Sequence, residues 1–186
     1  MKRLFVAVNL AAEVNARIAS RVLAPGTAAV DGVAWVKAEN LHVTVKFLGA
    51  TDPALVPAIE EALRGSAAAL PFELVARGTG AFPSRARPRV LWVGIDDPVG
   101  ALARLAADVE NRLAALGFAR ETRRYSPHLT VARVKSARPP ALDAFDACRT
   151  TDFGSSLTRE LVLYESQTLP TGARYVPLRV IRAPGL

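Results

Sequence analysis

The sequence LHVTV at residues 41–45 indicates an internal duplication, because its pattern returns 86 positions later as PHLTV at residues 127–131. These two stretches contain both histidines of the 186-residue chain, His42 and His128, and each histidine is followed two positions later by a threonine. In a β-strand, residues i and i+2 point to the same face of the sheet. Each stretch therefore predicts a strand that presents an imidazole and a hydroxyl side by side.

The two halves of the chain also match outside these motifs. With the same offset of 86, RLFVA at residues 3–7 aligns with RVLWV at residues 89–93 without a gap, and Pro53 aligns with Pro139. Each half then contains strand, helix, strand, histidine strand and helix, and such a long period excludes a solenoid. We expect one bilobal domain over residues 1–186, with two similar lobes and the histidine strands meeting at a pseudo-two-fold axis.

Hydrophobic periodicity and turn residues predict the separate elements. Strands are expected at residues 3–9, 33–37, 41–48, 72–80, 89–95, 125–134, 157–166 and 175–182. Helices are expected at residues 13–23, 53–64, 98–116 and 139–148, with a basic loop at 83–88 and a hairpin turn at 170–172. Long buried parallel strands are missing, so we predict an α+β fold. Two antiparallel sheets would face a central cleft, with the helices packed on the outside.

Composition limits the class of protein and its partners. The chain is 51% hydrophobic and 22% charged, which suits a soluble domain with a substantial core. No apolar run reaches the roughly 18 residues of a membrane span, so we expect no membrane partner. A single cysteine, Cys148, excludes an internal disulfide and a cysteine metal cluster, and we expect a cytoplasmic protein. The net charge of +7 suits RNA, DNA or a nucleotide, although a genome that prefers arginine explains it equally well.

Two histidines without a metal suit proton transfer. Zinc takes three or four protein ligands, and neither motif contains an Asp or Glu, so we expect neither a metal nor another cofactor. An imidazole titrates near a pKa of about 6.5, so one can accept a proton from a nucleophile while the other protonates a leaving group. Phosphodiester chemistry needs this pair and also donors to the non-bridging oxygens, which the hydroxyls of Thr44 and Thr130 can supply.

Two further candidates stand at equivalent positions, Arg133 five residues after His128 and Phe47 five residues after His42. Arg133 can contact phosphate, but its odd spacing puts it on the wrong face of a regular strand, so a bulge or an approach over the strand end is needed. Phe47 either stacks on a nucleobase, worth roughly 1–3 kcal/mol per base, or belongs to the core. Two arginine clusters either follow RNA phosphates or remain solvated surface: Arg85/Arg87/Arg89 and Arg123/Arg124.

The motifs, extended to residues 42–49 and 126–133, resemble the paired signatures of the two-histidine (2H) phosphoesterase superfamily. The chain is most similar to its RNA 2′,3′-cyclic phosphodiesterases, also called 2′–5′ RNA ligases, the LigT-like family. Further matching segments lie at residues 3–7, 80–84, 88–92, 161–166 and 172–175. The resemblance implies a metal-free enzyme that opens a 2′,3′-cyclic phosphate at the end of RNA to a 2′-phosphate, with an ATP-independent reversal that forms a 2′–5′ bond.

The same resemblance implies the roles of the site residues. His42 would donate a proton to the departing O3′, His128 would accept one from water, and Thr44, Thr130 and Arg133 would bind phosphate. The implied partner is RNA with a 2′,3′-cyclic phosphate end, with tRNA halves among the candidates, and we expect a monomer.

Two alternative functions stay open. One is a related enzyme that acts on small nucleotides such as ADP-ribose 1″,2″-cyclic phosphate. The other is an RNA-binding module without catalysis. The second is disfavoured, because a binding module does not need two titrating groups.

Overall fold

The computed structural model describes residues 1–23, 30–136, 140–170 and 172–183. The strands are β1 (Lys2–Val8), β2 (Val33–Trp35), β3 (Val43–Thr51), β4 (Phe72–Ser84), β5 (Arg87–Asp96), β6 (His128–Val134), β7 (Asp152–Thr158), β8 (Glu160–Leu169) and β9 (Gly172–Arg182). The α-helices are α1 (Ala12–Val22), α3 (Val56–Ser66), α4 (Ala101–Ala114) and α5 (Asp143–Ala147), and short 3-10 turns span Ala38–Asn40, Pro53–Leu55 and Ala67–Ala69.

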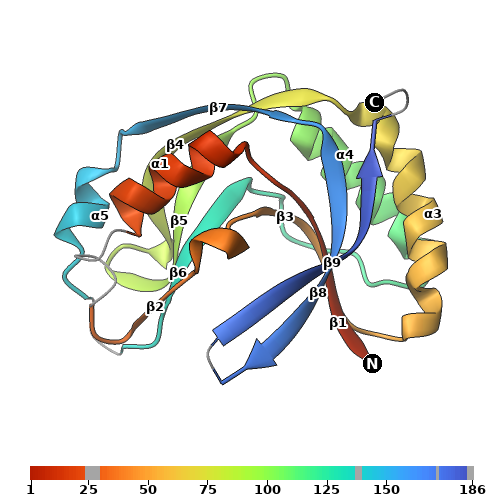
Figure 1. Ribbon diagram of the computed structural model, residues 1–186, viewed down its shortest axis with the longest axis horizontal. Coiled ribbons are helices and arrows are strands. Elements are labelled where there is room, and N and C mark those ends of the chain that lie inside the picture. Colours follow the sequence, from red (N-terminus) through yellow and green to blue (C-terminus); the bar gives the residue numbers. More distant parts are fainter. Residues whose placement is uncertain (24–29, 137–139, 171, 184–186) are drawn as a thin grey trace.

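The strands of the described residues form one curled antiparallel sheet of nine strands (Figure 1). Eight of them follow the order β7-β4-β5-β6-β3-β1-β8-β9, and β2 pairs with β6. Within the described residues, the two halves of the sheet are joined where Val43 of β3 lies opposite Leu129 of β6. The two sheets expected from the sequence are therefore the two halves of one sheet, and the histidine strands meet at its centre.

The helices cover the outside of the curled sheet. Helices α3 and α4 pack on the half that contains β3 and β9, and α1 and α5 pack on the half that contains β4 and β7 (Figure 1). The apolar stripe that predicted α1 is buried at Val14, Ile18 and Val22. Because α4 follows β5 along the chain but packs against β3, the two sequence halves are interleaved in space.

Several elements differ from the sequence expectation. Strand β7 was not expected, since its sequence DFGSSLT contains glycine and serines that disfavour strands. The expected basic loop at 83–88 is mostly strand, because β4 runs to Ser84 and β5 begins at Arg87. Strand β3 continues past Gly49, which has a φ of 72° at an irregular step opposite Leu4. Helix α5 is shorter than expected, and Pro139 lies outside the described residues.

Candidate active site

The sheet brings the two imidazoles onto one patch of its concave face. The residues that follow His42 and His128, Val43 and Leu129, are both fully buried in the core and lie opposite each other. Continuing this antiparallel register puts each histidine opposite the threonine of the other strand. Directly opposite residues have Cβ atoms about 4.5–5.5 Å apart. Two imidazoles and two hydroxyls therefore surround one small space.

A backbone carbonyl holds each imidazole in the same way. Nδ1 of His42 lies 2.7 Å from the carbonyl oxygen of Asn40, and Nδ1 of His128 lies 2.8 Å from that of Ser126. A carbonyl oxygen only accepts hydrogen bonds, so in each ring Nδ1 carries the hydrogen and donates it. Nε2 is then the nitrogen that exchanges protons with a ligand. Asn40 and Ser126 are also 86 positions apart, so the duplication includes this support.

His42 lies in an aromatic pocket on the concave face. Its Nε2 lies 3.1 Å from Oγ1 of Thr44, as expected for residues i and i+2 of a strand. Its ring centroid lies 4.9 Å from that of Phe5 and 5.1 Å from that of Tyr175, which meets it edge-on. Tyr164 stacks on Phe5, with the ring centroids 5.2 Å apart.

Burial by these rings makes the neutral form of His42 more stable. Desolvation is the largest effect on its pKa and lowers it from the usual 6.5, and the nearby imidazole of His128 lowers it further. The hydrogen bond to Asn40 opposes both effects. In the free protein, the His42 imidazole is therefore neutral near pH 7.

The two motifs do not predict the aromatic neighbours of the histidines, which lie on other strands. Phe82 meets His128 edge-on, with the ring centroids 5.1 Å apart. Phe5, Tyr164 and Tyr175 come from β1, β8 and β9. The one signal in the sequence was that all four lie in segments that resemble the family.

A β-bulge in β6 places Arg133 on the same face as His128. Trp92 of β5 lies opposite Thr130, but the next residue of β5, Leu91, lies opposite Ala132, so β6 contains one extra residue at this point. The register then resumes with Val90 opposite Arg133. The extra residue corrects the odd spacing, and the exposed Arg133 lies on the concave face with Thr130.

The equivalent bulge in β3 places Phe47 on the concave face. Ala7 of β1 lies opposite Thr44, whereas Val6 lies opposite Lys46 and Phe5 opposite Phe47. Phe47 is 65% exposed, so it does not belong to the core. Its ring centroid is 6.1 Å from that of Phe5, next to the aromatic pocket of His42.

A pocket of about 920 Å³ opens beside Thr44 and His128. Of the arginines in the two sequence clusters, Arg89, Arg123 and Arg124 line it. Arg85 instead binds the carboxylate of Asp146 in α5, with Nε 2.8 Å from Oδ1 and Nη2 2.7 Å from Oδ2. Arg87 is exposed at the tip of the β4–β5 hairpin.

Among the described residues, no group of three or more His, Cys, Asp or Glu side chains could hold a metal ion. None of the described helices has both the length and the apolar character to span a membrane.

Known proteins resemble the chain in sequence. The family model described as LigT like Phosphoesterase matches it twice, at residues 12–92 and 93–175, and each match contains one of the two histidine motifs. A protein of Archaeoglobus fulgidus named RNA 2′,3′-cyclic phosphodiesterase is 36% identical over 178 residues, 96% of this chain and 98% of the relative. A protein of Escherichia coli K12 with the same name is 30% identical over 183 residues, 96% of this chain and 94% of the relative.

Solved structures resemble it in fold. The protein TT0787 of Thermus thermophilus has a TM-score of 0.75 at 26% identity, with 98% of both chains covered. E. coli LigT complexed with 3′-AMP has a TM-score of 0.71 at 28% identity, again with 98% of both chains covered. The chain belongs to the family of LigT-like phosphoesterases.

Proposed function

We propose that this chain hydrolyses 2′,3′-cyclic phosphate ends of RNA to 2′-phosphates. The observation that carries the proposal is the pair of imidazoles of His42 and His128. They lie across adjacent strands, and a backbone carbonyl fixes Nδ1 of each ring. Relatives named for this reaction align with nearly the whole chain. A site built from two such imidazoles suits the transfer of one proton in and one proton out.

In the proposed reaction, water attacks the cyclic phosphate and the bond from phosphorus to O3′ breaks. His128 accepts the proton of the attacking water, and His42 donates a proton to O3′ as it departs. The hydroxyls of Thr44 and Thr130 and the guanidinium of Arg133 stabilise the charge that develops on the non-bridging oxygens. The product carries a 2′-phosphate and a free 3′-hydroxyl.

The donor role requires that His42 gain its proton after substrate binds. Its imidazole is neutral in the free protein, because burial lowers its pKa. A phosphate anion beside the ring favours the imidazolium and raises the pKa again. His42 can then donate the proton that the departing O3′ requires.

Phe47 supplies a face for a nucleobase in this proposal. Its ring is 65% exposed on the concave face, and base stacking on an aromatic side chain contributes roughly 1–3 kcal/mol. If the 5′-hydroxyl of a second RNA attacked the cyclic phosphate in place of water, with the same departure of O3′, the site would join the two strands through a 2′–5′ bond.

We further propose that the chain acts without a metal, as a monomer in the cytoplasm, on RNA fragments such as tRNA halves. Both histidines belong to one chain, so the catalytic pair needs no second copy. The proposals of metal-free action, a cytoplasmic location and RNA fragments as substrates rest on the composition and on the family resemblance.

The test is an assay with EDTA present. It uses an oligoribonucleotide with a 2′,3′-cyclic phosphate end and, in parallel, ADP-ribose 1″,2″-cyclic phosphate. We expect kcat/KM to be higher on the RNA, the product to be a 2′-phosphate, and EDTA to have no effect. Turnover that is lost with EDTA and restored by zinc or manganese would contradict the metal-free mechanism, and a preference for the ADP-ribose compound would contradict the RNA substrate.

A further inference from the structure

The two halves of the chain differ in the segment that leads into each histidine strand. In the first half this segment is β2, which pairs with β6, and the amide of Val36 donates to the carbonyl of Val131 at 2.8 Å. The offset of 86 puts residues 119–121 in the position of β2 and β3 in the position of β6. Residues 118–127 nevertheless contain no strand. The edge of β3 after Val43 is therefore not covered by the counterpart of β2.

Residues 118–127 form the corresponding segment of the second half. Side-chain contacts hold this segment against the protein, whereas backbone hydrogen bonds hold β2. The bulge in β3 turns Lys46 toward α4, where it is only 5% exposed. Its Nζ donates to Oε1 and Oε2 of Glu110 at 2.7 and 2.8 Å, and to the carbonyl of Ala119 at 2.8 Å. Oε2 of Glu110 also accepts from the amide of Glu121 at 3.3 Å. One buried ion pair thus fixes the start of the segment.

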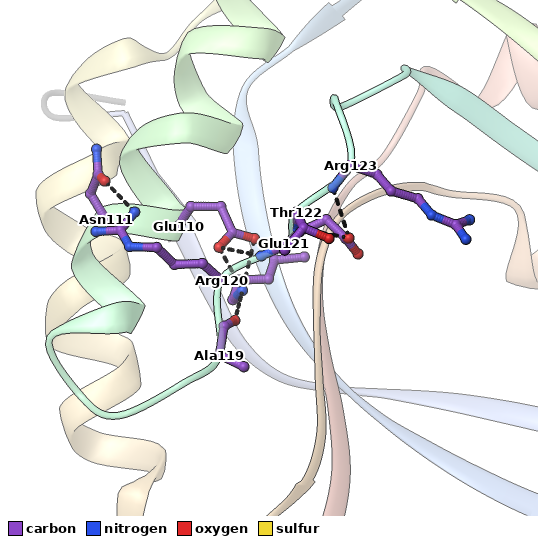
Figure 2. Close-up of polar contacts among 8 residues, drawn as sticks. Glu110, Asn111, Ala119, Arg120, Glu121, Thr122 and Arg123 are labelled. Atoms are coloured by element: carbon purple, nitrogen blue, oxygen red, sulfur yellow. Dashed lines mark hydrogen bonds and ion pairs between the residues drawn. The ribbon is translucent and has the colours of Figure 1, made fainter.

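Three further hydrogen bonds hold residues 120–123 in this segment (Figure 2). Nη1 of Arg120 donates to Oδ1 of Asn111 at 2.7 Å, which holds Arg120 against α4. Oε1 of Glu121 accepts from the amides of Thr122 and Arg123 at 2.9 and 3.1 Å. The side chain of Arg123 extends away from this cluster, as Figure 2 shows.

The pocket of about 920 Å³ fills the space between β3 and this segment. One wall is β3 at residues 44–47, another is α4, and a third is formed by residues 119–121 and 123–126, just before His128. The β4–β5 hairpin contributes a fourth wall at residues 82–83 and 89–90. Tyr125 ties the segment to β3 next to the site, because its hydroxyl donates to the carbonyl of Thr44 at 2.9 Å. Three alanines of α4 are among the lining residues: Ala103, Ala106 and Ala107.

We propose that this pocket binds the RNA strand on the 5′ side of the cyclic phosphate. A nucleoside next to the reacting end enters between β3 and residues 119–126, and Arg89, Arg123 and Arg124 bind the phosphates that follow it. All three arginines are exposed and line the pocket, and guanidinium groups suit phosphate because they can donate two parallel hydrogen bonds. The pocket is continuous with the site at Thr44 and His128, so one strand can occupy both. This inference rests on the proposed function, and it makes an oligonucleotide a better substrate than a mononucleotide.

The experiment measures kcat/KM on two substrates and compares the ratio of the two values between the wild-type protein and a variant. The first substrate is adenosine 2′,3′-cyclic phosphate, and the second is an eight-residue oligoadenylate with a 2′,3′-cyclic phosphate end. The variant Arg123→Ala/Arg124→Ala is expected to lower the ratio of oligonucleotide to mononucleotide kcat/KM roughly 2- to 30-fold, the effect of losing two exposed ion pairs. The salt dependence of log(kcat/KM) on the oligonucleotide should become shallower by roughly 1.4, which corresponds to two phosphates of a single strand.

The matched control is Arg21→Ala/Arg149→Ala, which removes two exposed arginines outside the pocket. We expect it to keep the wild-type ratio and most of the wild-type salt slope. The inference is overturned if the Arg123/Arg124 variant keeps the wild-type ratio, or if the control lowers that ratio equally.

Binding of a fluorescent octamer with a 2′-phosphate end, followed by anisotropy, separates this inference from the proposed function. If the wild-type protein hydrolyses neither substrate, the proposed function is wrong, and weaker octamer binding by the Arg123/Arg124 variant than by the control still supports the subsite. Equal binding by the variant and the control contradicts it.

Discussion

Burial determines the protonation state in which His42 meets its substrate. The aromatic rings around His42 lower its pKa more than the hydrogen bond to Asn40 raises it, and the charge of His128 adds to the lowering. We therefore predict that His42 titrates below pH 6.5 in an NMR titration of the free protein. The variant His128→Ala leaves one imidazole in the chain, so its signal belongs to His42 without further assignment.

In that variant the pKa of His42 should rise, because one unfavourable charge is gone, but it should stay below 6.5, because desolvation is the larger effect. Saturating inorganic phosphate should raise it further by favouring the imidazolium. A midpoint at or above 6.5 in the free wild-type protein would show that burial does not control this residue.

The two threonines provide a second test at the residue scale. Thr44→Val or Thr130→Val keeps the β-branched shape and removes one donor to the phosphate. We expect kcat/KM to fall roughly 10- to 1,000-fold, as when one transition-state donor is lost, without a change in the midpoint of thermal unfolding. Thr168→Val, at an exposed position of β8, is the matched control. Full activity in both site variants would assign the threonines to structure alone.

Residues were predictable where the chemistry is contained in one motif. Histidine and threonine at i and i+2 must share a strand face, so their arrangement followed from the pattern. The aromatic pocket was not predictable in this way, because Phe5, Tyr164 and Tyr175 come from three other strands. Their approach to His42 depends on the order of strands in the sheet, which no local spacing encodes.

At the scale of elements, the duplicated bulge explains why residues five positions after each histidine share its face. In the sequence, Val131 is an ordinary apolar strand residue, and only the pairing with β5 shows that it is the extra one. The bulge turns residues 46 and 132 toward the core face, where the two halves differ in sequence, with Lys46 in β3 and Ala132 in β6. This difference allows the second half to hold residues 119–121 through a side chain.

The ion pair of Lys46 and Glu110 should matter for stability because it is mostly buried, with side chains 4% and 19% exposed. Lys46→Met leaves the carboxylate of Glu110 without its partner. We expect the free energy of unfolding in urea to fall by roughly 2–4 kcal/mol, somewhat below the cost for a fully buried pair because Glu110 keeps some contact with water.

Two comparisons make this prediction specific. The double variant Lys46→Met/Glu110→Leu should recover most of the loss, since replacing both charges removes the buried, unpaired carboxylate. Arg112→Met breaks an exposed pair with Asp108, whose side chains are 41% and 42% exposed, and should cost less than about 1 kcal/mol. An equal loss from Lys46→Met and Arg112→Met would mean that burial adds nothing to the Lys46 pair.

At the scale of the whole molecule, the repeat of 86 residues predicted two similar lobes and a site where they meet. It did not predict that the lobes form one sheet, because their junction depends on the pairing of Val43 with Leu129. The repeat also did not predict that α4, which belongs to the second half of the sequence, packs against β3 of the first half. The pocket beside His128 lies where the second half has no counterpart of β2. The repeat therefore does not predict this pocket, because it shows only the features that the two halves share.

In the proposed mechanism the two histidines transfer different protons, and substrates with different leaving groups distinguish their roles. His42→Ala and His128→Ala should each lower kcat/KM roughly 100- to 10,000-fold on an RNA cyclic phosphate, the usual contribution of a general acid or base. On a nitrophenyl phosphodiester, whose leaving group departs without a proton, His42→Ala should regain activity close to that of the wild type and His128→Ala should not. Near wild-type kcat/KM of both variants on the RNA substrate would contradict the account.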